Sequence, residues 1–178
     1  FLLWKSIDIG DKKGRIRLNS GRKWDKRGNR GMELATGEFR NTLDEKGRLS
    51  LPAKLRTSLT SSVLIITQGM DNCLWVFTPE SWQKLSDQIF ESTSLFQQQG
   101  RNIQRRVIAP AQEVEIDKAG RIAIPQSLRE FAKLEKECVV LGIAHRIEIW
   151  DQETYKAWLE ATEAEFEAAS EALNIQNL

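Results

Sequence analysis

Residues 43–52 read LDEKGRLSLP and residues 116–125 read IDKAGRIAIP, so one motif occurs twice in the chain, 73 positions apart. The same offset also pairs Arg56 with Arg129, and it holds without drift over about forty residues. A constant offset of this length indicates two copies of one supersecondary unit. Two copies are too few for a solenoid, which needs about three stacked units to bury its faces. We therefore expect a pseudo-symmetric pair of units that share a core.

The residues around each motif predict a strand, a turn and a returning strand. In the first copy, Phe39, Asn41 and Leu43 alternate with polar residues, which is typical of a half-buried strand. An Asp-led, Gly-ended turn and the returning strand follow, and a proline then opens a short helix. Along the rest of both copies the sequence predicts strands at 63–67 and 73–77, a helix from 78, strands at 114–116 and 121–124, a helix at 125–133, strands at 137–141 and 146–150 around a turn at Gly142, and a helix from 151. This order indicates an α+β fold that is mainly β.

The chain divides by composition and by the repeat. We expect an extension at 1–36 that is disordered or non-native, a first unit at 37–85, a helical linker at 86–110, a second unit at 111–160, and an acidic helix or tail at 161–178. Units of this size have marginal cores alone, because a short chain buries a small fraction of its surface. The two units should therefore pack on each other.

The amino-terminal segment differs in charge from the rest of the chain. Residues 1–31 hold ten Lys/Arg and three Asp/Glu, a balance of +7, so the whole-chain charge of +1 leaves −6 for residues 32–178. The segment is either a basic arm for nucleic acid or sequence upstream of a true start at Met32. An anionic partner of the remaining residues must be met by a local basic patch, because their average field is negative.

Several classes of protein are disfavoured by composition. No run approaches the roughly 20 apolar residues of a membrane span, and no signal-peptide pattern is present. Cys73 and Cys138 belong to no Cys-x-x-Cys pair, and His145 is the single histidine, so a zinc site lacks ligands. We expect both cysteines to be buried, and we expect no metal, no cofactor, no membrane association and a cytoplasmic location.

The repeated turn is the feature that carries chemistry. Its aspartate can accept hydrogen bonds from turn amides or pair with the arginine four positions later, and its glycine lets the chain reverse. A rigid turn would then hold the arginine in a fixed position, which suits bidentate contact with guanine or phosphate. A solvated arginine in a purely structural hairpin is the alternative, and the residues alone leave both open. The turn-organising residues are Asp44, Gly47, Asp117 and Gly120, and the cations are Lys46, Arg48, Lys118 and Arg121.

A catalytic role for the paired turns is disfavoured. Asp44 and Asp117 could form a carboxylate dyad that shares a proton. Such a dyad needs an apolar cleft that keeps one carboxyl protonated, whereas each aspartate here is followed by Lys and Arg in a polar turn. Neighbouring cations lower a carboxyl pKa. We therefore predict that the chain is not an enzyme.

The quoted residues resemble a known family. The doubled Asp-x-x-x-Arg hairpin, Arg105-Arg106 before the second copy, LEKECVVLG at 134–142 and RIEIW at 146–150 are similar to MraZ, a family of bacterial transcriptional regulators with two tandem AbrB/SpoVT-like units. The resemblance covers residues 37 to about 165. It implies swapped hairpins that pack as a pseudo-symmetric β-barrel with short flanking helices, and a ring-shaped homo-oligomer.

The resemblance also implies a function. A protein of this family would bind double-stranded DNA at direct repeats upstream of its own gene, in the division and cell-wall cluster, as a nucleoid-associated repressor. The family's motif arginine carries over to Arg48, with Lys46 beside it, and to Arg121 and Lys118 in the second copy; Arg40 on the first strand is a further candidate contact. The alternative is an AbrB-type protein–protein or antitoxin-like module, favoured by the −6 charge and the acidic carboxyl terminus.

Overall fold

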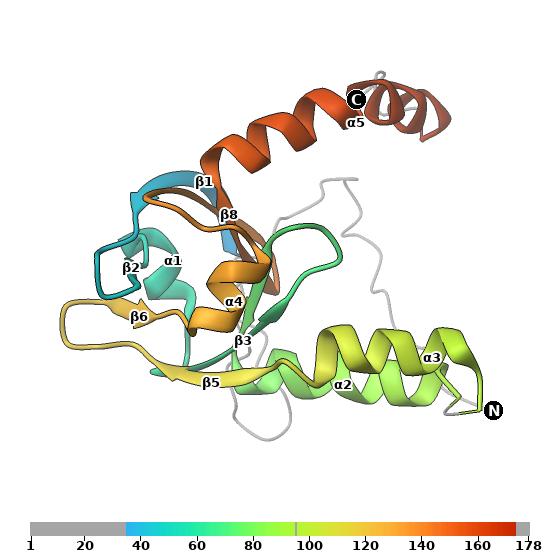
Figure 1. The fold of residues 1–178 in the computed structure, drawn as a ribbon, viewed down its shortest axis with the longest axis horizontal. Coiled ribbons are helices and arrows are strands. Elements are labelled where there is room, and N and C mark those ends of the chain that lie inside the picture. The colour runs from blue at the N-terminus through green and yellow to red at the C-terminus, as the bar shows by residue number, and fades with distance from the viewer. Residues whose placement is uncertain (1–34, 95, 174–178) are drawn as a thin grey trace, which may run out of the picture. The chain divides into compact units, whose positions relative to one another are not determined.

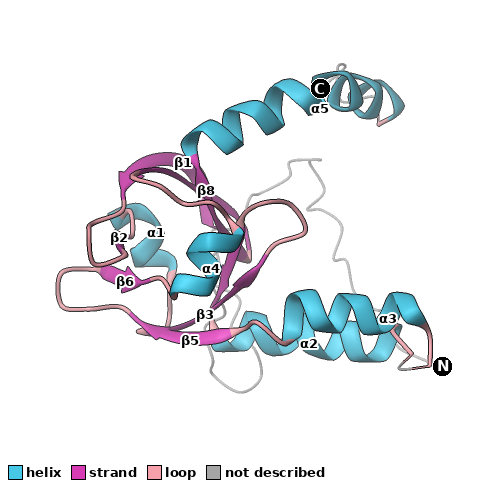
Figure 2. Cartoon of the chain, in the orientation of Figure 1, coloured by secondary structure: helices cyan, strands magenta, loops and turns pink. Residues whose placement is uncertain are grey.

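The computed structural model describes residues 35–94 and 96–173 (Figures 1 and 2). The basic segment 1–31 and the expected start at Met32 lie outside the described residues. The described chain is a mainly antiparallel α+β fold in which a six-stranded sheet is accompanied by a two-stranded ladder and by helices. The fold class expected from the repeat is therefore confirmed.

The two units contain the same elements in the same order. The first unit contributes β1 (Ala35–Thr42), β2 (Arg48–Ser50), α1 (Ala53–Ser58), β3 (Val63–Gln68), β4 (Leu74–Phe77) and α2 (Pro79–Ser92). The second unit contributes β5 (Gln112–Glu115), β6 (Arg121–Ala123), α4 (Gln126–Phe131), β7 (Glu137–Ala144), β8 (Arg146–Asp151) and α5 (Gln152–Ala172). Between them lie α3 (Gln98–Ile103) and η1 (Gln104–Ile108), a π-helical turn. The unit boundaries expected at 85 and 160 fall inside α2 and α5.

The sheet is built by exchange of strands between the units. Its order is β1-β7-β8-β4-β3-β5, which reads the same when the two units are interchanged. The first strand of each unit therefore pairs in the other unit: β1 lies antiparallel to β7, and β5 lies antiparallel to β3. This exchange is the expected swap, whereas closure into a barrel stays a prediction.

Two pairs of residues mark the pseudo-twofold axis. In the β2–β6 ladder Leu49 faces Ile122, and at the centre of the large sheet Trp75 faces Glu148. Each pair consists of residues 73 positions apart, so equivalent positions of the two copies meet directly across the axis. The sequence repeat is therefore a spatial symmetry, and the β2–β6 ladder joins the two motifs.

The main core draws on both units. Six of its buried side chains form repeat pairs, with 0–3% of each exposed: Leu49 with Ile122, Leu51 with Ile124, and Leu55 with Leu128. Burial of one Leu or Ile contributes about 1.5–3 kcal/mol relative to exposure. Because the six side chains pack in one cluster, separation of the units would expose all of them. The expectation of a shared core is confirmed.

One predicted turn is wrong. Gly142 lies inside β7, where it pairs with Ile147, and the chain reverses at Ala144 and His145 instead. The ladder continues past Gly142 because β7 also pairs with β1 over all eight of its residues. Ala144 then adopts a left-handed φ of 53° in a tighter turn than the corresponding one of the first unit.

The two cysteines are buried thiols. Cys73 and Cys138 are 0% and 1% exposed and form no disulfide. Burial raises the pKa of Cys138 to about 12 and also raises that of Cys73. Both thiols therefore stay protonated at neutral pH and act as small apolar side chains, as the sequence predicts.

The end of α4 offers a test of backbone strain. Lys133 has a left-handed φ of 51°, while the N–H of Leu134 donates to the carbonyl of Arg129 at 2.9 Å. Glycine is favoured at this helix-ending position because it has no Cβ. Lys133→Gly should raise the free energy of unfolding by roughly 0.5–1 kcal/mol in urea denaturation. Lys133→Ala is the control, because it keeps the Cβ; an equal gain in both variants would contradict this cause.

Candidate nucleic-acid interface

The first turn is organised by one carboxylate. Asp44 Oδ1 accepts the backbone N–H groups of Lys46 and Arg48, both at 2.9 Å. Asp44 Oδ2 accepts Arg48 Nε at 2.7 Å and lies 2.7 Å from Arg48 Nη2. The N–H of Gly47 donates to the carbonyl of Asp44 at 2.8 Å and closes the reversal. One side chain therefore holds both the loop and the guanidinium.

The second turn repeats this geometry atom for atom. Asp117 Oδ1 accepts the N–H groups of Ala119 and Arg121 at 2.8 and 2.9 Å, and Oδ2 lies 2.9 Å from both Nε and Nη2 of Arg121. The sequence left two roles open for the aspartate, which were to accept turn amides or to pair with the arginine. In both turns it does both.

The donors around each carboxylate hold it in the charged form. The backbone N–H of Arg48 is the largest cause that lowers the pKa of Asp44, and the N–H of Arg121 does the same for Asp117. A dyad that shares a proton needs the opposite shift in one member. The two aspartates are structural anions, and the arrangement offers no general acid.

Within the described residues, each motif arginine has one guanidinium edge in use and one edge without a partner. Nε and one Nη2 hydrogen face the aspartate, which leaves the second Nη2 hydrogen and one Nη1 hydrogen as a parallel pair on the distal edge, while the other Nη1 hydrogen points back toward Cδ. The Arg48 and Arg121 side chains are 32% and 34% exposed. Because the aspartate fixes the plane of the guanidinium, the distal edge is a preoriented pair of donors.

The β2–β6 ladder places both arginines on one outer face. Arg48 lies opposite Ala123, and Arg121 lies opposite Ser50, while Leu49 and its partner point into the core. Arg48 and Arg121 are thus diagonal neighbours on the ladder, with roughly 7–8 Å between their backbone positions. Ser50 and Ala123, which lie opposite Arg121 and Arg48, are exposed and have small side chains. The two turns lie together at the left of Figure 1.

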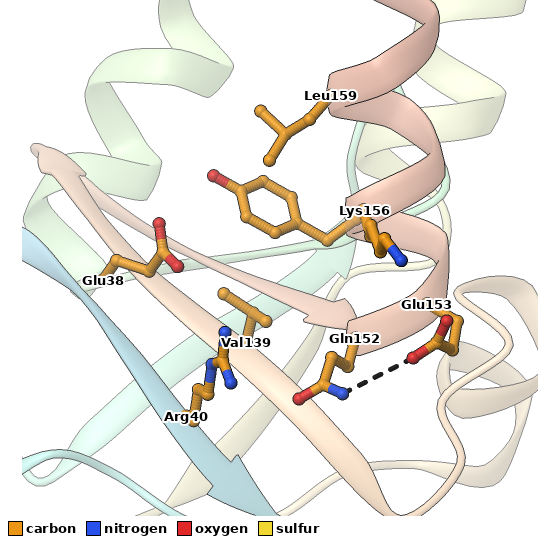
Figure 3. Close-up of a pocket in the computed structure, with 8 residues that line it drawn as sticks. Glu38, Arg40, Val139, Gln152, Glu153, Lys156 and Leu159 are labelled. Carbon is orange, nitrogen blue, oxygen red and sulfur yellow. Dashed lines mark hydrogen bonds between the residues drawn. The ribbon is translucent and has the colours of Figure 1, made fainter.

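The remaining predicted cations divide between two places. Lys46 and Lys118 are exposed within their turns, beside the motif arginines. Arg40 lies elsewhere: it lines a shallow pocket of about 180 Å³ between β1, β7 and α5, near Glu38 and Lys156 (Figure 3). Successive side chains of a strand point to opposite faces, and the neighbouring Asn41 donates to Ser50 O at 2.8 Å. Arg40 therefore faces away from the ladder.

Two arginines at the turns were missed by sequence reasoning. Gly47 and Gly120 have left-handed φ values of 72° and 77°, and both are buried although their turns are exposed. A Cβ on Gly47 would lie 2.7 Å from Arg129 Cζ, and one on Gly120 would lie 2.6 Å from Arg56 Cζ. The sequence repeat pairs Arg56 with Arg129, but only the strand exchange reveals that each covers the turn of the other unit.

Comparison with known proteins identifies the family. A family model described as "MraZ protein, putative antitoxin-like" matches the chain twice, at residues 34–106 and 107–176. The chain belongs to the MraZ family. A protein of Treponema denticola named "Transcriptional regulator MraZ" is 55% identical over 138 residues, which are 78% of this chain and 96% of that protein. Proteins of the same name from two strains of Treponema pallidum are 51% identical over 78% of this chain and 93% of their own length. Transcriptional regulators are a non-enzymatic class, in agreement with the prediction that the chain is not an enzyme.

Two further properties of the described residues bear on the site. Among them no cluster of three or more His, Cys, Asp or Glu side chains is arranged to hold a metal ion. No helix in the same part of the chain combines the length and apolar character needed to cross a bilayer.

The hydrogen-bonded carboxylates of Asp44 and Asp117 should contribute to stability in a way that depends on pH. A pKa lowered on folding stabilises the protein above the ordinary value of 3.8, and this contribution is lost as the pH falls through the folded-state pKa. Replacement of both Asp44 and Asp117 by Asn should make the free energy of unfolding less steeply pH-dependent below pH 3.8, as measured by urea denaturation at a series of pH values. Asp87→Asn, on an exposed face of α2, should leave the slope as in wild type. A double variant with the wild-type slope would contradict the locked arrangement.

Proposed function

We propose that this chain is a sequence-specific DNA-binding transcriptional regulator that represses its own gene by binding direct repeats upstream of the division and cell-wall cluster. The observation that carries the proposal is the pair of preoriented arginines, Arg48 and Arg121, on one outer face of the β2–β6 ladder. The names of the MraZ relatives support it. A cytoplasmic, nucleoid-associated location is part of the same proposal.

The geometry suits recognition of a base edge. An arginine that is free in solution loses up to roughly 2 kcal/mol of side-chain entropy when it is fixed. The aspartate of each turn has already restricted Arg48 and Arg121, so less entropy is lost when DNA binds. The distal guanidinium edge presents two parallel donors, which match the O6 and N7 acceptors of guanine or two phosphate oxygens.

The lysines and the overall charge add a salt-dependent component. Lys46 and Lys118 are exposed beside the arginines and suit phosphate contact. Because residues 32–178 carry −6, the rest of that surface contributes no general attraction to DNA. Binding should therefore depend on a few local contacts and weaken strongly as salt displaces them. A contact of Arg40 with DNA stays a prediction, and it would involve a different face.

Substitution of the first motif arginine tests the proposal. Arg48→Ala should weaken binding to the chain's own promoter by about tenfold or more, since a bidentate arginine–base contact contributes roughly 1–3 kcal/mol. Gel shifts at matched salt measure the change, with Arg121→Ala as the second-copy comparison. Lys84→Ala is the control, because Lys84 pairs with Glu80 on α2. Wild-type affinity for Arg48→Ala would remove the assigned role.

A protein–protein or antitoxin-like module is the second candidate. It is favoured by the words "antitoxin-like" in the description of the family and by five glutamates without a compensating base at residues 160–171 of α5. In that case the rigid turns would meet a protein surface. The two candidates differ in a simple measurement, because only a DNA-binding protein has a salt-dependent affinity for duplex DNA.

Self-assembly into a ring is part of the proposal, and α5 supplies one candidate contact surface. Leu159, Phe166 and Leu173 are 42%, 66% and 70% exposed and recur every seven residues, which is the spacing of a helix–helix seam. Glu163 and Glu165 flank the seam, so two copies of α5 would repel each other. A complementary surface exists near α3 and η1, where Phe90 and Phe96 are 53% and 97% exposed and Arg105 and Arg106 are also exposed. Contact between unlike surfaces of successive copies forms a ring when the rotation closes.

A glutamate introduced on either of the two proposed contact surfaces tests the assembly. Phe166→Glu and Phe96→Glu should each lower the molar mass measured by light scattering, because each buries a carboxylate in the proposed contact. Met70→Glu is the matched control, since Met70 is 58% exposed in the loop between β3 and β4. If Phe166→Glu keeps the wild-type mass, α5 does not take part in the contact.

A further inference from the structure

We propose that Arg129, which belongs to the second unit, is a positioning residue for the first turn and acts on DNA through Arg48. The inference rests on the proposed function and deepens it, because it states that each recognition turn is shaped by the other unit. Arg56 has the corresponding place at the second turn, where its packing differs. The contacts of Gly47, which immediately precedes Arg48, carry the argument.

Gly47 is enclosed by atoms of the second unit on two sides. Its carbonyl accepts the N–H of Ile124 at 2.9 Å, and its Cα is covered by the guanidinium of Arg129. A Cβ built on Gly47 would lie 2.7, 2.8 and 3.0 Å from Cζ, Nη1 and Nε of Arg129. Similar distances to three atoms of one plane place that plane flat over the glycine. The residue before Arg48 therefore cannot shift toward solvent without displacing Arg129.

The backbone of Arg129 is held firmly. Its N–H donates to the carbonyl of Pro125 at 3.0 Å, and its carbonyl accepts the N–H of Leu134 at 2.9 Å. The neighbouring Leu128 is 0% exposed in the main core. The guanidinium thus extends from a rigid short helix. It can therefore prevent the turn that it covers from shifting toward solvent.

Arg129 keeps this place at an energetic cost. Among the described residues its Nε is buried and has no hydrogen-bond partner. A buried unsatisfied donor costs roughly 1–3 kcal/mol. An arginine that served only as a solvated surface charge would avoid this cost by turning its Nε to water. Its retention over Gly47 indicates that the planar contact itself is what the site uses.

The second turn is enclosed at least as closely, but its arginine is placed differently. Gly120 receives the matching backbone bond from Leu51 N at 2.9 Å, but the nearest atoms to its Cβ position are Nη1, Cζ and Cδ of Arg56. This set includes the aliphatic stem, so Arg56 meets the glycine by its edge, and the Arg56 residue is exposed. Arg129 lies flat over its glycine and has a buried Nε, whereas Arg56 is exposed, so we assign the positioning role to Arg129 and the first turn.

The binding test separates positioning from direct charge contact. Arg129→Lys keeps the charge but loses the plane, and Arg129→Met loses both. If Arg129 positions Arg48, both variants should bind promoter DNA about tenfold more weakly, and neither should lower affinity further in an Arg48→Ala background. The slope of log affinity against log salt should stay as in wild type. Wild-type binding by Arg129→Lys, together with a slope reduced by about one in Arg129→Met, would overturn positioning and indicate a phosphate contact.

A second measurement needs no DNA. Hydrogen exchange of the Arg129 variants should be about tenfold or more faster at residues 44–48 than in wild type, with residues 117–121 unchanged. Arg56→Lys should have the reverse pattern, and Lys84→Met should alter neither segment. Unchanged exchange at 44–48 in Arg129→Lys would overturn the inference even if Arg129→Met fails to fold. If wild type binds no duplex in a salt-dependent manner, the proposed function fails, while the exchange result still decides the role of Arg129.

Discussion

The pairing of β2 with β6 across the pseudo-twofold axis is the contact on which the rest of the structure depends. It brings Leu49 and Ile122 together at the centre of the shared core, and it sets Arg48 and Arg121 on the opposite, outer face of the same ladder. A shift of one residue in this register would reverse both faces, because side chains alternate along a strand. Burial of the core therefore fixes where the candidate DNA contacts stand, and the stability of the fold and the geometry of the site depend on the same three residue pairs.

Within each turn, the aspartate reduces the number of guanidinium hydrogens that a ligand can contact, but it fixes the direction of those that remain. An unpaired arginine could offer every guanidinium hydrogen to a ligand, but it would have to be ordered on binding. Asp44 and Asp117 each take the Nε edge and hold the plane, so a smaller set of donors is presented in a fixed direction. For recognition of a base, direction matters more than the number of donors, because an incorrectly placed pair cannot match two acceptors at once. The donors to these carboxylates favour their charged form, which disfavours a dyad that shares a proton.

The local parts of this arrangement are predictable from sequence, and the non-local parts are not. Asp, Gly and Arg at fixed spacing specify a turn by short-range chemistry, so the organisation around Asp44 and Asp117 follows from the motif. The strand exchange does not follow from the repeat alone, which is equally compatible with two units that each keep their own first strand; the resemblance to MraZ is what implies the swap. Because the repeat alone does not distinguish these pairings, it does not predict that Arg129 covers Gly47. It also explains the turn wrongly placed at Gly142, since the extension of β7 depends on its pairing with β1.

Joining the two copies in one chain permits differences that an identical pair could not have. On the axis Trp75 faces Glu148, which is 7% exposed and satisfied by Arg146 Nε at 2.9 Å and Trp150 Nε1 at 3.1 Å, while Arg146 also lies over the Trp75 ring. Two copies of the second unit would place glutamate against glutamate there, at the cost of two buried like charges. The turns differ in the same way, with Glu45-Lys46 in one and Lys118-Ala119 in the other. A true twofold axis favours palindromic sites, whereas direct repeats require subunits related by translation or by rotation about a ring axis. Under the proposed function, the internal pseudosymmetry of one subunit therefore cannot by itself account for direct repeats, and head-to-tail contact between successive copies has to supply their spacing.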